Sequence, residues 1–484
     1  MKSHLLKYLR TALAVLCLAA ATVLFVDFSG WSASHLSWMA KIQFVPAVLA
    51  LNLVVVVALV LLTLLFGRLY CSVICPLGVA QDAIAWLRRR VGSKQKKRLG
   101  FYRFTPEKRA WRYGFLALFL LLLAASALAL VPVSYAGLLD PYSSFGRMAG
   151  QGAVPLWRLA ADAIASWQAG RGVYLFDTVP SATVMLSLGV GAVALASFVV
   201  VLVFALRTGR GYCNTVCPVG TVLGLLSRFS LLRPVIDTER CNRCGSCGRR
   251  CKAECIDTKK HRIDYSRCVV CLDCVNNCSQ GAISYGLRRK TKAEAQTASK
   301  PDGARRAFLV GAAIVAGGAV ASASDKLTDG GLAPLKEKKR RRSVLPSVPP
   351  GAESLRHFRS HCTACQLCVS QCPNEVLRPS TSADGLMQPV MVFTSGFCRP
   401  ECTRCGEVCP TGAIRQIDAS EKSAIKTGTA CVDAAICISA AYGQSCGNCA
   451  RHCLAGAIVM VKGDNGNMRP AVDAARCIGC GSCE

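Results

Sequence analysis

Apolar runs separated by polar links fill the first 210 residues of the chain. Four of these runs reach the length of about 20 residues that a helix needs to cross a bilayer: 11–29, 45–66, 113–133 and 183–206. A buried helix of a soluble protein can be equally apolar, but four in succession favour membrane spans. The pattern therefore predicts an all-α module of four transmembrane helices within residues 1–230.

Basic residues in the polar links orient the predicted spans. Residues 88–112 contain eleven Lys and Arg, whereas residues 30–44 contain one and residues 134–182 contain three. Because positively charged loops stay on the cytoplasmic side, the N-terminus, the loop 67–112 and the chain just after residue 206 are predicted to be cytoplasmic. We expect a multi-pass protein of the cytoplasmic (inner) membrane, with lipid as a partner.

Cysteine content and charge narrow the class of protein. The 484 residues include 30 cysteines, most of them after residue 240, and carry a net charge of +30. A small disulfide-rich secreted domain is neither this long nor this apolar, so disulfides are not the expected use of these thiols. The basic residues flank apolar segments without an aromatic-basic recognition motif, so nucleic acid is not an expected partner.

Residues 231–290 contain two cysteine runs with the same spacing. They are Cys241-x2-Cys244-x2-Cys247-x3-Cys251 and Cys268-x2-Cys271-x2-Cys274-x3-Cys278. This is the spacing of bacterial ferredoxins, in which three thiolates of one run share a [4Fe–4S] cluster with the fourth thiolate of the other run. The expected ligand sets are Cys241, Cys244, Cys247 with Cys278, and Cys268, Cys271, Cys274 with Cys251. A zinc site, the alternative, uses two C-x2-C pairs instead.

Two details depart from the usual ferredoxin motif. The proline that commonly follows the fourth cysteine is replaced by Lys252 in one run and by Ser279 in the other. Cys255 is left over from both ligand sets, and we expect it to be a buried structural thiol. Neither departure removes a predicted ligand, so an α+β ferredoxin module with two [4Fe–4S] clusters remains the interpretation.

Residues 357–484 repeat the cysteine theme less regularly and predict a polycluster domain. Crossed ligation gives three complete sets: Cys362, Cys365, Cys368 with Cys409; Cys398, Cys402, Cys405 with Cys372; and Cys477, Cys480, Cys483 with Cys453. Cys437, Cys446 and Cys449 then lack a fourth thiolate. The expectation is that the chain is truncated within its last motif. The alternatives are a three-iron cluster, no cluster, or Cys431 as a substitute ligand. This domain would hold up to four clusters.

A different cysteine pattern occurs twice in the membrane module. Gly67-Arg-Leu-Tyr-Cys71-Ser-Val-Ile-Cys75-Pro76 follows the second apolar run, and Gly209-Arg-Gly-Tyr-Cys213-Asn-Thr-Val-Cys217-Pro218 follows the fourth. This repetition predicts two related helical hairpins. Thiols four residues apart on a helix share a face, so Cys71, Cys75, Cys213 and Cys217 are candidate ligands of one metal or cluster. A packing or interaction role is the alternative.

Other redox cofactors have no support in the sequence. No C-x-x-C-H motif is present, and neither His4 nor His35 lies within an apolar run, so haem is not expected. No G-x-G-x-x-G or Walker loop follows a strand, which leaves flavin, nicotinamide and nucleotide without a site. No catalytic residue is assigned.

The apolar and cysteine patterns together resemble a known family. Four apolar runs, two C-x3-C-P motifs, the outer segment Asp140–Arg147 and a two-cluster block make residues 1–285 similar to the membrane subunit of the quinol dehydrogenase that feeds periplasmic nitrate reductase, the NapH type. Residues 300–484 resemble its partner of the NapG type, a four-cluster ferredoxin exported by the twin-arginine route. The linker 291–356 contains Arg305-Arg306 ahead of an Ala/Gly-rich stretch, so its segment 305–323 resembles that export signal.

This resemblance implies a fusion of two subunits that serves anaerobic respiration. The quinol pool would be the electron source, and a redox protein such as a periplasmic reductase would be the acceptor. The first ferredoxin domain would be cytoplasmic and the C-terminal domain periplasmic; without export, both would stay cytoplasmic. The two C-x3-C-P loops and the segment Asp140–Arg147 are candidates for quinone and subunit contacts.

Three functions remain open on the sequence alone. The first is an electron conduit that passes electrons from quinol through the clusters, as the quinol dehydrogenase component of a larger system. The second is an assembly or maintenance factor that supplies reducing equivalents to an oxidase or nitrous-oxide reductase, because related polyferredoxins accompany such enzymes. The third is a redox sensor.

Overall fold

The computed structural model describes residues 2–27, 29–91, 102–169, 171, 188–287, 328–329, 333–334, 346–394, 396–463 and 466–484. The chain divides into two units, one of Met1–Arg288 with Ser347–Glu484 and one of Arg289–Pro346. In the smaller unit, β5 (Thr328–Asp329) pairs antiparallel with β6 (Ala333–Pro334). The twin-arginine-like segment 305–323 and most of the expected linker 291–356 lie outside the described residues.

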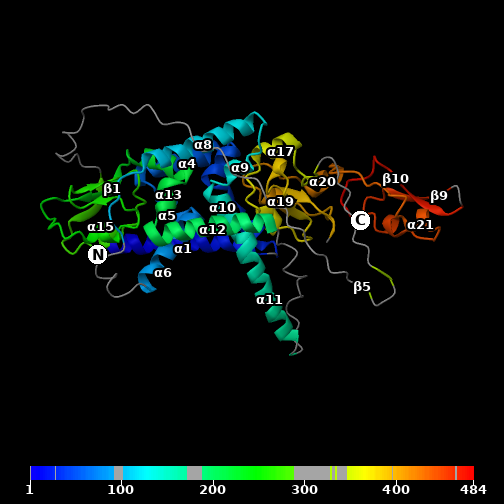
Figure 1. Ribbon diagram of the computed structural model, residues 1–484, viewed down its shortest axis with the longest axis horizontal. Helices are drawn as coiled ribbons and strands as arrows, with labels where there is room; N and C mark the ends of the chain where they lie inside the picture. Colours follow the sequence, from blue (N-terminus) through cyan, green and yellow to red (C-terminus); the bar gives the residue numbers. More distant parts are fainter. Residues whose placement is uncertain are drawn as a thin grey trace. The chain divides into compact units, whose positions relative to one another are not determined.

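Three helices in the described part of the chain are long and apolar enough to cross a membrane. They are α1 (Lys2–Val26), α8 (Arg109–Ala127) and α12 (Leu188–Thr208). Figure 1 shows the axes of these three helices roughly aligned. They cover three of the four predicted spans. Leu, Val, Ala and Phe on their outer faces remain exposed, as a lipid-facing surface requires.

The second predicted span, 45–66, is not one helix. The chain forms α3 (Phe44–Leu49), turns, and continues as α4 (Leu53–Phe66), which has 14 residues. Leu51 adopts a left-handed φ of 52°, and the side chain of Asn52 accepts a hydrogen bond from the Val55 N–H at 3.2 Å. This cap starts a new helix within an apolar run, so the expectation of four uninterrupted long helices is wrong at this place.

The two C-x3-C-P repeats fold alike. Each follows the end of an apolar helix at a glycine with positive φ, 77° at Gly67 and 68° at Gly209. A five-residue helix then carries the first cysteine, and a proline at the first helical turn follows the second cysteine. The helices of the two repeats are α5 (Leu69–Val73), α6 (Pro76–Val91), α13 (Gly211–Thr215) and α14 (Pro218–Ser227).

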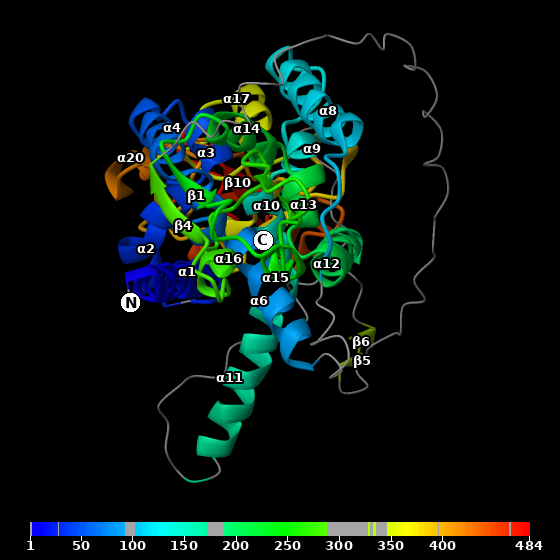
Figure 2. The same cartoon turned by 90° about the vertical axis from the view of Figure 1, so that its left-hand side faces the viewer.

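The segments between the long helices form short helices. They are α2 (Trp31–Lys41), α9 (Ser134–Gly137), α10 (Pro141–Met148), a π-helix (Ala149–Ala153) and α11 (Val154–Ala169). Pro141 occupies the first turn of α10, and the Asp140 carboxylate accepts the Ser143 N–H at 2.8 Å, which caps this helix. Figure 2 shows α11 projecting away from the other helices.

The first cysteine block forms a small module with two antiparallel pairs of strands. Strand β1 pairs with β4 in the register Leu232↔Leu287 to Ile236↔Ile283, and β2 pairs with β3. Two short helices follow the cysteine loops. The elements are β1 (Leu232–Ile236), α15 (Ser246–Arg250), β2 (Ile256–Asp257), β3 (Arg262–Ile263), α16 (Asp273–Asn276) and β4 (Ile283–Leu287).

The second cysteine-rich region also combines short helices with two-stranded hairpins. Strand β7 pairs with β8 and β9 with β10, both antiparallel. Its helices are α17 (Leu355–His361), α18 (Leu367–Ser370), a 3-10 helix (Ala383–Gly385), α19 (Arg404–Glu407), α20 (Ala419–Ala424), α21 (Ile438–Ala441) and α22 (Asn448–Arg451). Its strands are β7 (Leu377–Pro379), β8 (Pro389–Met391), β9 (Ile458–Lys462) and β10 (Met468–Val472).

Helix α1 contacts both cysteine-rich modules, one near each of its ends. Near its start, the Lys7 ammonium lies 2.8 Å from the Asp273 carboxylate of the first module. At its end, the Gln371 amide of the second module donates to the Leu24 carbonyl at 2.6 Å. At 1.5 Å per residue, these contacts are about 25 Å apart along the helix. The two modules therefore lie at opposite ends of α1 (Figure 1).

Close packing within the second repeat yields a stability prediction. A Cβ atom at Gly220 would overlap the Cys213 carbonyl oxygen, which is backbone and cannot easily move. Gly220→Ala should therefore lower the free energy of unfolding by about 1–3 kcal/mol, as overpacking does in close-packed interiors. Thermal unfolding in detergent micelles measures this effect. Gly114→Ala in α8 is the control, because no heavy atom lies within 4 Å of its Cβ position; equal melting temperatures for the two variants would contradict the prediction.

Candidate metal centres

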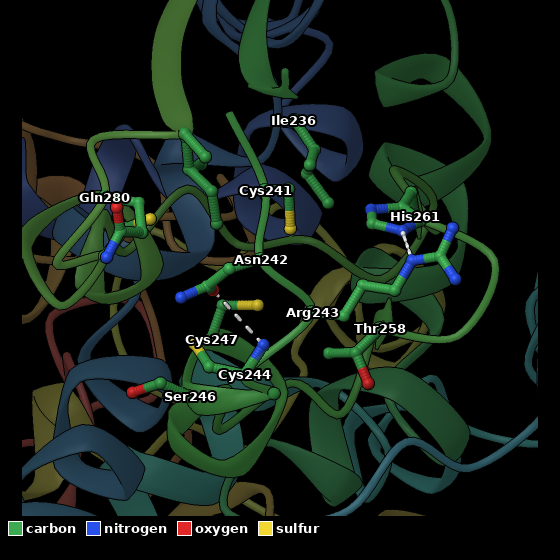
Figure 3. Close-up of a pocket in the computed structure, with 14 residues that line it drawn as sticks. Ile236, Cys241, Asn242, Arg243, Cys244, Ser246, Cys247, Thr258, His261 and Gln280 are labelled. Carbon is green, nitrogen blue, oxygen red and sulfur yellow. Dashed lines mark hydrogen bonds between the residues drawn. The ribbon is translucent and has the colours of Figure 1, made fainter. Parts of the chain in front are cut away.

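One cavity in the first cysteine-rich module is lined by the first predicted ligand set. Cys241, Cys244, Cys247 and Cys278 all border it; Cys241 and Cys244 lie on the loop before α15, and Cys247 lies in the first turn of that helix (Figure 3). Left-handed backbone at Arg243 and Gly245, with φ of 59° and 72°, bends this loop. The structure thus brings together four thiols that are up to 37 residues apart in the sequence.

A second cavity in the same module is lined by the other predicted set. Cys268, Cys271, Cys274 and Cys251 border it, together with the leftover Cys255. Two cavities with four crossed cysteines each suit two [4Fe–4S] clusters. Among the described residues, no group of three or more His, Cys, Asp or Glu side chains is already arranged as a metal site. Ligation of clusters by these residues is a proposal.

Cys255 lies closer to the second ligand set than its interpretation as a structural thiol implies. It is 1% exposed, and its Sγ atom is 3.5 Å from the Cys251 Sγ atom. The hydrogen bond between the two lowers the pKa of Cys251 to about 7, and the same bond raises the pKa of Cys255 well above its ordinary value. The expected burial is present, but the neighbour is a candidate ligand.

In the second cysteine-rich region, neighbouring thiols follow the predicted crossed sets. Burial, together with nearby Cys362, Cys365 and Cys409, raises the pKa of Cys368. Burial also raises the pKa of Cys405, where Cys398, Cys372 and Cys402 are the neighbouring thiols. For Cys483, burial raises the pKa beside Cys480, Cys453 and Cys477. The neighbours of Cys405 and of Cys483 each match one predicted set, whereas Cys368 also lies near Cys405 of the adjacent set.

The incomplete set is less well assembled. A hydrogen bond with Ser439 lowers the pKa of Cys437, and this thiol lies near the protein surface. Cys431 is exposed, and the N–H of its neighbour Ala430 donates to the Cys477 Sγ atom at 3.4 Å, a thiol of another set. The ligands of a cluster at Cys437, Cys446 and Cys449 therefore remain a prediction.

The four cysteines of the C-x3-C-P repeats, Cys71, Cys75, Cys213 and Cys217, are all buried. Two arginines that the sequence analysis did not single out cross between the repeats. Arg68 donates to the Cys213 carbonyl at 3.1 Å, and Arg210 donates to the Cys71 carbonyl at 2.7 Å. The sequence Gly-Arg-x-Tyr-Cys, which both repeats contain, was the signal that could have identified these two arginines.

The crossed arginines also place positive charge beside the thiols. An Arg68 N–H lies 3.7 Å from the Cys71 Sγ atom, and an Arg210 N–H lies 3.9 Å from the Cys213 Sγ atom. The Gln81 amide donates to the same Cys213 sulfur at 3.2 Å. Metal-bound thiolates are anionic, so guanidinium groups and an amide donor are suitable neighbours for them. A metal held by the four repeat thiols remains a prediction.

A buried ion network joins the repeats to the first cysteine-rich module. The Asp82 carboxylate lies 2.6 Å from Arg210, 2.8 Å from the Lys252 ammonium and 3.5 Å from Arg10. Lys252 directly follows the predicted ligand Cys251 and also lies 3.8 Å from Asp273. The lysine that replaces the usual proline therefore binds the ferredoxin module to the membrane module.

The outer segment Asp140–Arg147 packs on the second cysteine-rich module. Ser143 Oγ donates to Thr363 Oγ1 at 3.0 Å, and Arg147 donates to the Ala364 carbonyl at 3.5 Å. A Cβ atom at Gly146 would overlap the Cys365 carbonyl oxygen, so the absence of a side chain permits this close approach. The segment contacts the second cysteine-rich module, and its predicted roles in quinone and subunit contacts remain predictions.

Comparison with known families supports iron–sulfur chemistry in the membrane module. The family described as a 4Fe-4S binding domain matches residues 48–94 and 190–236. These ranges contain the four C-x3-C-P cysteines and no other cysteine. No solved structure matches the chain.

Curated relatives match different parts of the chain. The ferredoxin-type protein NapG of Escherichia coli is 30% identical over 198 residues, which cover 38% of this chain and 82% of that protein. The ferredoxin-type protein NapH of Haemophilus influenzae is 26% identical over 249 residues, 49% of this chain and 69% of that protein. The methylamine utilization ferredoxin-type protein MauM of Methylobacillus flagellatus is 33% identical over 147 residues, 28% of this chain, and the chain spans only 61% of its length.

The buried network predicts a large penalty for Asp82→Asn. Losing this carboxylate leaves Arg210 buried without its counter-charge and leaves Lys252 with the more distant Asp273 alone, which should cost about 3–5 kcal/mol. The melting temperature in detergent micelles should fall, and limited proteolysis should cleave the first cysteine-rich module more readily. Glu421→Gln is the control, because its pair with Arg415 is exposed and should contribute about 0–1 kcal/mol. A similar loss in both variants would refute the role of the network.

Proposed function

Since the chain belongs to the family of ferredoxin-type iron–sulfur proteins that includes NapG and NapH, we propose that it carries electrons across a membrane. The source is quinol, and electrons pass through [4Fe–4S] clusters at both ends of the helical module to an exported acceptor such as a periplasmic reductase. The protein would supply the cluster ligands, the nearby charges and the surrounding insulation, and bound clusters would supply one-electron redox chemistry.

The observation that carries this proposal is the pair of contacts made by α1. A helix of 25 apolar-rich residues touches one cysteine-rich module through Lys7 and the other through Leu24. Such a length spans a bilayer, and the basic loop 88–112 belongs on the cytoplasmic side. This arrangement supports a cytoplasmic first module and a periplasmic second module.

The C-x3-C-P thiols are a suitable intermediate station. Cys71, Cys75 and Cys217 belong to the same hydrophobic core as Cys251, Cys271 and Cys274 of the first module. Phe145 packs against this core and also against the core that contains Cys362 and Cys368 of the second module. A metal or cluster on the four repeat cysteines would therefore lie along continuous packed protein between the two modules.

Topology can be tested by proteolysis of spheroplasts. Protease added from outside should degrade the region 357–484, while residues 231–287 stay protected until the cells are lysed. Arg305→Lys together with Arg306→Lys should protect the C-terminal region as well, because twin-arginine export would fail. Protection of both regions in the unaltered protein would contradict the proposed placement, and antibodies against each module would report the fragments.

Electron entry and the intermediate station can be tested on the purified protein. A reduced menaquinone analogue should reduce clusters in both modules, and electron paramagnetic resonance (EPR) measures this reduction. Replacing Cys71 and Cys213 by serine should block electron transfer to one of the two modules. The fraction of clusters reduced should then fall about twofold if the two modules hold comparable numbers of clusters. Cys17→Ser is the control, because Cys17 lies on α1, apart from the repeats.

Two outcomes would count against this function. No cluster reduction by any quinol would remove quinol as the source. Full reduction in the Cys71→Ser/Cys213→Ser protein would show that electrons do not need the repeat thiols. Quinol could reduce the clusters while cells that lack the protein lose only the maturation of a respiratory metalloenzyme. In that case the assembly-factor interpretation would replace the electron conduit.

A further inference from the structure

The second cavity of the first cysteine-rich module has one cysteine more than a [4Fe–4S] cluster needs. Its lining contains Cys251, Cys268, Cys271 and Cys274, and Cys255 as a fifth thiol. The lining of the first cavity contains four cysteines and Ala282. The two cavities are related by the repeated motif, so the difference between them is informative.

A shared turn explains how Cys255 reaches this position. The Glu254 N–H donates to the Cys251 carbonyl at 3.0 Å, and Glu254 adopts a left-handed φ of 50°. In the sister run, the Gly281 N–H donates to the Cys278 carbonyl at 3.2 Å, with φ of 61°. Each turn directs the next residue back toward the cavity. That next residue is Cys255 in one run and Ala282 in the other.

The remaining motifs of the chain show what this position usually holds. Four residues after the last cysteine of each run stand Ala282, Val376, Ala413 and Ala457, all of them buried. A small or branched apolar side chain is therefore sufficient for packing at this place. Cys255 departs from an apolar pattern that the chain repeats four times, and packing alone does not require its sulfur.

We propose that Cys255 is a reserve ligand, able to replace Cys251 in holding a [4Fe–4S] cluster in the second cavity. This inference rests on the proposed ligation of that cluster. The two sulfur atoms are 3.5 Å apart, so an exchange needs side-chain rotation and no backbone rearrangement. The Asp264 N–H holds the Cys255 carbonyl at 2.8 Å and fixes the backbone at this point.

The exchange is balanced without an oxidant or reductant. The iron–sulfur bond to Cys251 breaks, a bond to Cys255 forms, and the proton of the Cys255 thiol moves to the Cys251 thiolate. The cluster keeps four thiolates and its charge. The exchange would protect a cluster that lies beside the repeats. Cys251, Cys271 and Cys274 belong to the core that also contains Cys71, Cys75 and Cys217. The cluster nearest the membrane module would thus survive displacement of one ligand.

Single-ligand variants in the two cavities provide the test. The full-length protein is purified without oxygen, oxidised with ferricyanide, and examined by EPR for three-iron clusters, alongside iron analysis. A cluster that loses its fourth thiolate readily loses one iron, so Cys278→Ala should give a three-iron signal about tenfold stronger than Cys251→Ala. In Cys251→Ala, Cys255 should preserve the four-iron cluster.

Two further variants separate a reserve ligand from a hydrogen-bond donor. Adding Cys255→Ala to Cys251→Ala should raise the three-iron signal to the level of Cys278→Ala. Transplanting the thiol, in the Cys278→Ala/Ala282→Cys protein, should lower that signal toward the level of the unaltered protein. The transplant needs no alteration of the second cavity, so it remains informative if Cys251→Ala fails to fold.

Specific results would overturn the inference. Equal three-iron signals in Cys251→Ala and Cys278→Ala would show that Cys255 does not take over. An unchanged signal after the Ala282→Cys transplant would show that this position cannot supply a ligand. Absence of [4Fe–4S] signals from the unaltered protein would instead remove the proposed function on which the inference rests, so the two failures are distinguishable.

Discussion

The crossed hydrogen bonds that Arg68 and Arg210 make between the two repeats are the interaction on which the rest of the structure depends. Each guanidinium leaves its own repeat and donates to the carbonyl of the first cysteine in the other. A buried guanidinium is expensive unless hydrogen bonds and counter-charge satisfy it. The crossing therefore fixes the two repeats against each other, and with them the four buried thiols that they carry.

The same charges extend the constraint into the first cysteine-rich module. Arg210 shares the Asp82 carboxylate with Lys252, the residue directly after the candidate ligand Cys251. Arg68 also donates to the Ser266 carbonyl, two residues before Cys268. The orientation of the ferredoxin loops is thus tied to the repeats by buried polar contacts. An electron-transfer protein needs such fixed geometry, because its cofactors must stay at set positions within insulating protein.

The second cysteine-rich module depends on a different kind of contact. Backbone approaches at Gly137 and Gly146, side-chain hydrogen bonds such as Ser143 to Thr363, and the packing of Phe25 and Tyr142 join it to the other end of the helices. These contacts combine close packing with one buried ion pair, Arg158 with Glu375, whereas several buried charges hold the first module. The repeat cysteines lie between these two attachments.

Cysteine spacing predicted the crossed sets, and the structure gathers Cys241, Cys244, Cys247 and Cys278 around one cavity. Apolar length predicted α1, α8 and α12, because a bilayer imposes a length that composition reveals. Hydrophobicity could not predict the break before α4, where a backbone turn and the Asn52 cap override an apolar run. The partners of Arg68 and Lys252 became evident only in the folded protein, because their contacts join segments that are far apart in the sequence. Cys255 meets Cys251 through a local turn, which the cysteine spacing alone does not predict.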